Sequence, residues 1–149
     1  MKRIQAFKFR LKTKSKAANI LLRIAGSCRF VYNRARELQI KRYEQGEKYL
    51  SYASICENLI EWKHEKVWLN QSPSQSLQQS LKDLDRAYQN FFNKRAHFPK
   101  QKKRGIHDSF RYPQGCKLDQ IKHRIFLPKI GWIKYIHTQE ISGLSLIHI

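Results

Sequence analysis

The spacing of apolar residues changes twice along this 149-residue chain, and these changes limit the folds open to it. Residues 5–12 alternate between apolar and basic side chains, which predicts a half-buried strand with a basic outer face. The alternating residues are Phe7, Lys8, Phe9, Arg10, Leu11 and Lys12. Helical spacing follows over 13–96, and short β-like runs return after residue 97. This order predicts an α+β fold, in which a small basic β-barrel-like wedge is interrupted by a helical bundle.

The helical part begins with a candidate helix-turn-helix. Apolar residues at intervals of four and three predict helices over about 15–25 and 28–45, meeting at a corner formed by Gly26 and Ser27. The second of these helices is basic, which would suit contact with nucleic acid. A plain helical hairpin with a solvated basic side fits the pattern equally well. The basic residues are Arg29, Arg34, Arg36, Lys41 and Arg42.

Two further helices are predicted from capping residues and apolar stripes. Ser51 or Ser54 starts one of them, and Ser54 with Glu57 fits a capping box. In the other, Ser72 is the predicted N-cap, followed by a proline and a capping glutamine. The stripes consist of Ile55, Leu59 and Trp62 in the first helix and of Leu77, Leu81, Leu84, Tyr88 and Phe91 in the second, which ends near Arg95.

The face of the last helix opposite its apolar stripe is polar. Its amides and cations can contact base edges or phosphates, but they suit a solvated helix face equally well. The residues are Gln78, Gln79, Lys82, Arg86, Asn90 and Asn93. Beyond this helix, β-like runs are predicted at 109–112, 124–127 and 132–136. The expected organisation is a first strand (1–12), a helical insert (13–96) and the remaining strands (97–143), with a separate tail (144–149).

Charge points to the partner. The chain has 30 Lys and Arg against 11 Asp and Glu, a net charge of +19, which favours a polyanion and nucleic acid over a membrane. No apolar run approaches a membrane span, so a cytoplasmic protein is expected. Cys28, Cys56 and Cys116 form no C-x-x-C pair, which argues against a disulfide framework or a zinc site. Asp83 and Asp85 lie two apart on a helix and cannot converge on a metal, so we expect neither catalysis nor a cofactor in this chain.

Eight blocks of sequence together resemble the first part of TnpB, the OrfB-type protein of bacterial insertion sequences. They occur in the family's order and spacing between about residues 3 and 143. The blocks are FKFRL at 7–11, CRFVYN at 28–33, KYLSY at 48–52, PSQ at 73–75, LDRAYQNFF at 84–92, FPK at 98–100, DSFRYP at 108–113 and LPKIGW at 127–132.

The resemblance implies a role in RNA-guided DNA cleavage. In the family, a β-barrel wedge and a helical insert with an N-terminal helix-turn-helix hold the guide RNA and a short DNA motif beside the target. Tyr52 and Gln78 occupy positions that contact this motif in the family, and Cys56, Ser74 and Gln75 occupy neighbouring positions. With basic residues added from the wedge, the candidate nucleic-acid-binding residues are Lys8, Arg10, Tyr52, Gln75, Gln78, Gln79, Lys82, Lys102, Lys103, Arg104 and Arg111.

The catalytic half of the family is expected beyond residue 143. It is a RuvC-like nuclease that holds a divalent metal such as magnesium on three carboxylates, followed by a zinc ribbon. This chain is therefore expected to bind guide RNA and target DNA without cutting. Residues 144–149 (LSLIHI) match the translation of a sequencing-library adaptor, which suggests that this tail is not native; a short apolar tail is the alternative.

Two other functions fit parts of the pattern. A self-sufficient helix-turn-helix regulator would bind duplex DNA without RNA, usually as a dimer on spaced half-sites. A structural RNA-binding protein of the ribosomal type would explain the charge but not the order of the blocks.

Overall fold

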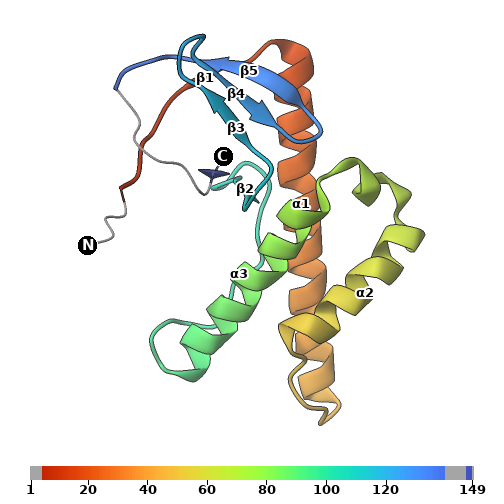
Figure 1. The fold of residues 1–149 in the computed structure, drawn as a ribbon. Helices are drawn as coiled ribbons and strands as arrows, with labels where there is room; N and C mark the ends of the chain where they lie inside the picture. The colour runs from red at the N-terminus through yellow and green to blue at the C-terminus, as the bar shows by residue number, and fades with distance from the viewer. Residues whose placement is uncertain (1–4, 140–146, 149) are drawn as a thin grey trace.

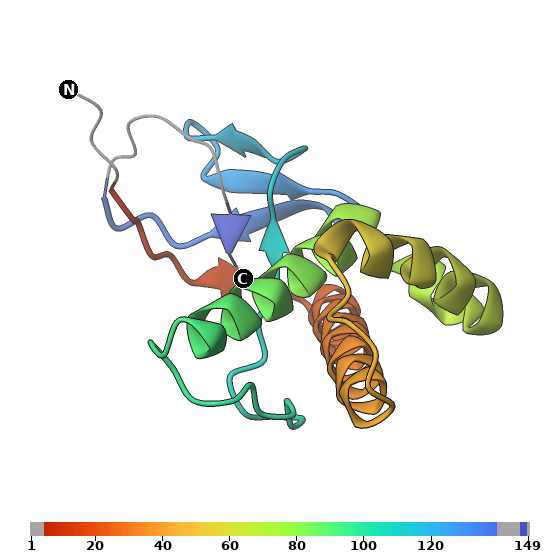
Figure 2. The same ribbon diagram turned by 90° about the horizontal axis from the view of Figure 1, so that it is seen from below.

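The computed structural model describes residues 5–139 and 147–148, and its fold is α+β, as predicted (Figure 1). Three α-helices lie beneath a small antiparallel sheet (Figure 2). The helical elements are α1 (Ser15–Glu44), α2 (Tyr52–Glu65), the 3-10 helix η1 (Val67–Gln71) and α3 (Ser74–Phe92). The strands are β1 (Leu11–Lys12), β2 (Arg111–Tyr112), β3 (Lys117–Asp119), β4 (Arg124–Leu127), β5 (Gly131–Tyr135) and β6 (Ile147–His148).

The main sheet joins strands from distant parts of the chain but does not close. Its order is β1-β5-β4-β3, and β1 pairs with β5 through Leu11 opposite Tyr135. The predicted barrel-like wedge is wrong, because β1 and β3 form the two edges of an open sheet and β2 pairs separately with β6. Strands of two to five residues are too short to curl the sheet back onto itself.

The strand predictions were right about pattern and less accurate about extent. β4 has the predicted bounds, and β5 is shifted by one residue from its prediction. β3 was missed, and only the last two residues of the 5–12 segment are strand. Even so, exposure alternates along 7–12 as expected, and the Ile136 N–H donates to the Arg10 carbonyl at 2.9 Å. Of the proposed tail, Ile147 and His148 form β6, while 144–146 and 149 lie outside the described residues. Its non-native origin stays a prediction.

The predicted corner at Gly26-Ser27 is wrong, because α1 runs through it as one helix of 30 residues. Contacts with α3 hold the middle of α1 in its helical conformation. Ser27 and Cys28 are buried, and the Ser80 hydroxyl of α3 donates to the Cys28 carbonyl at 2.8 Å. The low helix propensity of glycine costs about 1 kcal/mol, which burial of α1 side chains between Ile24 and Gln39 offsets.

Ser51, one of the two predicted starts of α2, is confirmed, whereas α3 begins one residue later than predicted. Ser51 caps α2, its hydroxyl accepting from the Ser54 N–H at 3.3 Å, so the Ser54–Glu57 capping box is wrong. At α3, Pro73 precedes the first turn and no side chain caps it. Ser72 does not cap because η1 leads directly into α3 and leaves Ser72 buried. The helix ends at Phe92, before the predicted Arg95.

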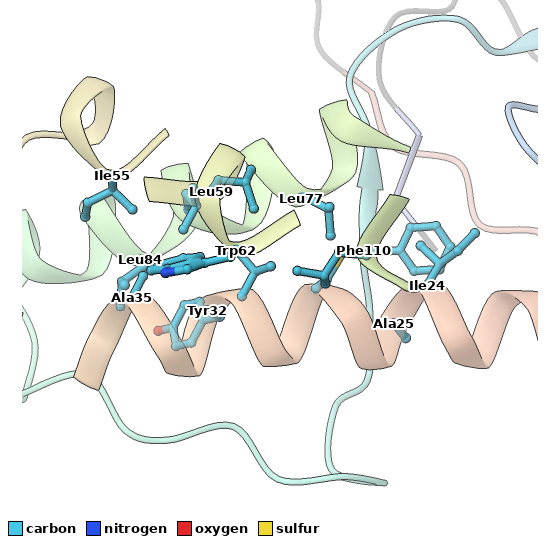
Figure 3. Packing of buried hydrophobic residues seen from close by; sticks show 14 of the residues in the cluster. Ile24, Ala25, Tyr32, Ala35, Ile55, Leu59, Trp62, Leu77, Leu84 and Phe110 are labelled. Carbon is cyan, nitrogen blue, oxygen red and sulfur yellow. The ribbon is translucent and has the colours of Figure 1, made fainter. Parts of the chain in front are cut away.

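The core lies between the three helices (Figure 3), and buried residues of the strands continue it. The predicted stripes of α2 and α3 are buried, except that Phe91 is 36% exposed and contacts Phe98 instead. Phe110, Tyr112, Leu127 and Ile133 extend the same cluster to the strands. Helices and sheet are therefore fixed relative to one another. No described helix is long and apolar enough to cross a membrane.

Candidate nucleic-acid interface

The two helices α2 and α3 bring the key predicted residues together along one seam. Near one end of the seam, the Lys82 ammonium lies 5.8 Å from the centroid of the Tyr52 ring. At the other end, the Lys63 ammonium donates to the Ser74 hydroxyl at 2.7 Å. The start of α2 thus faces the middle of α3, and the end of α2 faces its start. The two helices are antiparallel.

Helical spacing fills in the middle of this seam. Cys56 follows Tyr52 by one turn, and Gln78 lies one turn before Lys82, so both belong to the same strip of surface. Burial, together with a hydrogen bond to Cys56, raises the pKa of Tyr52 to about 12. Tyr52 is therefore a neutral donor and aromatic ring at physiological pH. We use the name α2–α3 seam for Tyr52, Cys56, Lys63, Ser74, Gln78 and Lys82.

The polar face of α3 contains the other predicted amides. Gln78 and Lys82 are exposed, whereas Gln75 and Gln79 are half-buried. Gln79 reaches the Asp83 carboxylate of its own helix at 3.5 Å. Gln78 and Lys82 are accordingly accessible to a ligand, as are Arg86 and Asn93 further along the same face.

Lys63 is a seam residue that was not among the residues predicted from the sequence to bind nucleic acid. Burial lowers its pKa, and the neighbouring Lys129 in the β4–β5 turn lowers it further. Its position eleven residues after Tyr52, on the same side of the helix, was the available signal. Two cations held close together favour an anion beside them.

The predicted residues of the connection between α3 and β2 separate into two kinds. Lys103 and Arg104 are exposed. Lys102 points inward, with its ammonium 4.4 Å from the Tyr32 ring centroid, and burial lowers its pKa. Its backbone N–H and carbonyl are both bonded to the Asn33 side chain, at 2.8 and 2.9 Å. Lys102 thus anchors the connection to α1.

Arg111, Lys8 and Arg10 lie apart from the seam. Arg111 of β2 forms an ion pair with Asp83 of α3 and is half-buried, so it joins the strand to the helix. Lys8 and Arg10 are exposed and precede β1, at the edge of the main sheet (Figure 1). The predicted set therefore occupies three surfaces, of which the α2–α3 seam is the one with mixed aromatic, amide and basic groups.

Among the described residues, no group of three or more His, Cys, Asp and Glu side chains is placed to hold a metal ion. Several acidic side chains instead form ion pairs with cations, and some of these pairs join different elements. One of them joins Arg29 of α1 to Asp108 at 2.7 Å. A hydrogen bond from the Gly105 N–H, helped by Arg29, lowers the pKa of Asp108 and keeps it charged.

Comparison with known proteins identifies relatives of this chain. The family model of the OrfB helix-turn-helix domain matches residues 1–48, a range that includes β1 and α1 here. InsQ of Escherichia coli K12 is 55% identical over 146 residues, which are 97% of this chain and 36% of InsQ. A protein of Streptomyces pristinaespiralis is 36% identical over 102 residues, 67% of this chain and 25% of that protein. Both carry the name "Putative RNA-guided DNA endonuclease".

The chain thus spans about a third or less of each of these two relatives. The matched helix-turn-helix domain and the high identity to InsQ over nearly all of the chain agree with the resemblance found in the sequence blocks. The chain belongs to the TnpB (OrfB-type) family of insertion-sequence proteins, and its residues 1–48 match the helix-turn-helix domain model of that family.

Proposed function

We propose that this chain is the nucleic-acid-binding part of a TnpB-type RNA-guided system, with the α2–α3 seam contacting duplex DNA. The observation that carries this proposal is the clustering of Tyr52, Gln78 and Lys82 on two packed helices. A glutamine amide can pair with an adenine edge, and a tyrosine ring can pack on a thymine methyl group. Lys63 and Lys82 supply charge for the adjacent phosphates.

The exposed cations outside the seam would hold the sugar–phosphate backbones of guide RNA and target DNA. Lys8, Arg10, Lys103 and Arg104 are exposed, and the net charge of +19 gives the chain a strong attraction for polyanions. Lys102 and Arg111 would support this surface, since both are engaged within the fold. This chain alone would bind without cutting, so plasmid DNA incubated with it and Mg²⁺ should stay intact.

The test is a Gln78→Ala substitution measured against duplexes that the wild-type chain selects from a randomised library. If Gln78 contacts a base edge, the variant should lose about 5- to 100-fold in affinity for the selected duplex and change little on unselected DNA. Gln89→Ala is the matched control, because Gln89 is an exposed glutamine near the end of the same helix.

Equal binding of selected duplexes by the Gln78 variant and the wild type would contradict a seam that contacts bases. A single-stranded RNA added in the same assay separates two functions. RNA-dependent duplex binding is expected of the TnpB role. Tight sequence-specific binding by a dimer without RNA would instead favour the helix-turn-helix regulator.

A further inference from the structure

The outer face of the main sheet combines aromatic and basic side chains in a regular pattern. Phe126 of β4 lies opposite Trp132 of β5, and Lys117 of β3 lies opposite Phe126. One step along, Arg124 lies opposite Lys134, which in turn lies opposite Lys12 of β1. Residues paired across strands, and alternate residues along a strand, share a face. We call this set the outer sheet face: Lys12, Lys117, Arg124, Phe126, Trp132 and Lys134, with the acidic Asp119 opposite Arg124.

The opposite face of the sheet is occupied by the core. Leu127, Ile133 and Tyr135 point there and are at most 5% exposed. Trp132, by contrast, is 44% exposed, and Lys12, Lys117 and Lys134 are exposed as well. The outer sheet face is therefore uncovered across four strands in the part of the chain that the structure describes.

Side chains on this face are already arranged as a stack. The Arg124 guanidinium lies 4.4 Å from the Trp132 ring centroid, and its Nε is 3.2 Å from the Asp119 carboxylate, which fixes its orientation. Phe126 meets Trp132 edge-on at 5.6 Å, and the Lys117 ammonium lies 5.6 Å from the Phe126 ring. The rings and the guanidinium plane thus hold one another in place before any ligand binds.

This chemistry matches the unpaired nucleotide of a single strand. Bases stack on aromatic rings and on arginine guanidinium planes, while the surrounding cations hold phosphates. A base within a duplex is covered by its neighbours and cannot use such a surface. Exposed tryptophan also carries a cost in water, which stacking a base removes. The basic character continues toward Lys8 and Arg10, giving a strand room to extend along β1.

We propose that the outer sheet face is a stacking platform for an unpaired nucleotide of RNA or DNA, centred on Trp132 and Arg124. The phosphates on either side of the stacked base bind Lys12, Lys117 and Lys134. This proposal rests on the proposed nucleic-acid-binding function and adds a second site, on a different face from the α2–α3 seam.

The test uses the full chain with oligo(U) RNA, oligo(dT) DNA and a duplex of equal length. Trp132→Ala should weaken single-strand binding by about tenfold or more and leave duplex binding within about twofold. Trp132→Phe, which keeps a ring, should retain most of the affinity. The matched control is Trp68→Ala, since Trp68 is 43% exposed but lies on η1 and is not part of the outer sheet face. Comparing the RNA and DNA arms identifies the preferred strand.

A second readout leaves Trp132 intact. In a Trp68→Phe protein, Trp132 and the buried Trp62 are the remaining tryptophans, so oligo(U) or oligo(dT) should quench the Trp132 emission. Absence of quenching by both oligonucleotides, or unchanged single-strand affinity of folded Trp132→Ala, would overturn the platform. Equal losses on single strands and duplex would overturn it too. If the wild type binds duplex but no single strand, the platform proposal is overturned and the proposed function stands. If it binds neither, the proposed function fails with it.

Discussion

At the scale of single residues, burial decides which polar groups are available for chemistry. Cys28 is 3% exposed, and its thiol donates to the Ser76 carbonyl at 3.6 Å. Burial raises its pKa to about 12, against a smaller lowering effect from Lys102. Cys56 is half-buried on the α2–α3 seam. The three cysteines are all free, but they differ in access.

We therefore predict that iodoacetamide at pH 8 modifies Cys56 at least about tenfold faster than Cys28, because thiolate and access are both needed. The raised pKa also sets a sign for stability. The folded state prefers the neutral Cys28 thiol. Its contribution to the free energy of unfolding is therefore fully present below the unfolded pKa of about 8.5 and is lost as pH rises toward 12. Mass spectrometry of labelled peptides measures the rates, with a urea-unfolded sample as the control. Equal rates in the folded chain would contradict this packing of Cys28.

At the scale of elements, the continuity of α1 has a direct consequence. Gly26 does not adopt a left-handed conformation, and a Cβ added there would meet the Arg29 side chain at 3.4 Å, an ordinary contact. Gly46 differs, because it follows the end of α1 with a φ of 75°. Its N–H donates to the Tyr43 carbonyl at 3.0 Å and helps to end the helix. One glycine lies within a helix, and the other terminates it.

Gly26→Ala should raise the free energy of unfolding by roughly 0.5–1 kcal/mol, because alanine favours the helix and restricts the unfolded chain. Gly46→Ala should lower it by a comparable amount, since a side chain is strained at positive φ. Urea denaturation followed by circular dichroism measures both variants. A destabilised Gly26 variant would indicate that α1 bends at this residue, as in a helix-turn-helix.

At the scale of the whole molecule, charge and packing act against each other. The core ties the helices to the sheet through Phe110 and Tyr112, whose rings contact each other at 5.4 Å. The net charge of +19 acts against this compact state, because the cations repel one another. The ion pairs that cross elements, such as Arg29 with Asp108 and Arg34 with Glu65, offset only part of this repulsion.

Raising NaCl from about 20 to 300 mM should therefore increase the Tm of the free chain by a few degrees, through screening of its excess positive charge. The same change should weaken duplex binding steeply, since released counterions drive that binding. Differential scanning fluorimetry and fluorescence anisotropy measure the two effects. A Tm that falls with salt would mean that the cross-element ion pairs outweigh the net repulsion.

The local spacing of apolar residues was enough to predict the α+β class, the buried stripes of α2 and α3, and the alternation along 7–12. The sequence blocks also identified the family. Tertiary contacts decided the rest. Packing on Ser80 keeps α1 straight across Gly26, the pairing partners leave the sheet open, and the antiparallel contact of α2 and α3 joins Tyr52 to Lys82. Inward contacts likewise engage Lys102 and Arg111 within the fold, and no spacing along the chain encodes them, because their partners are distant in sequence.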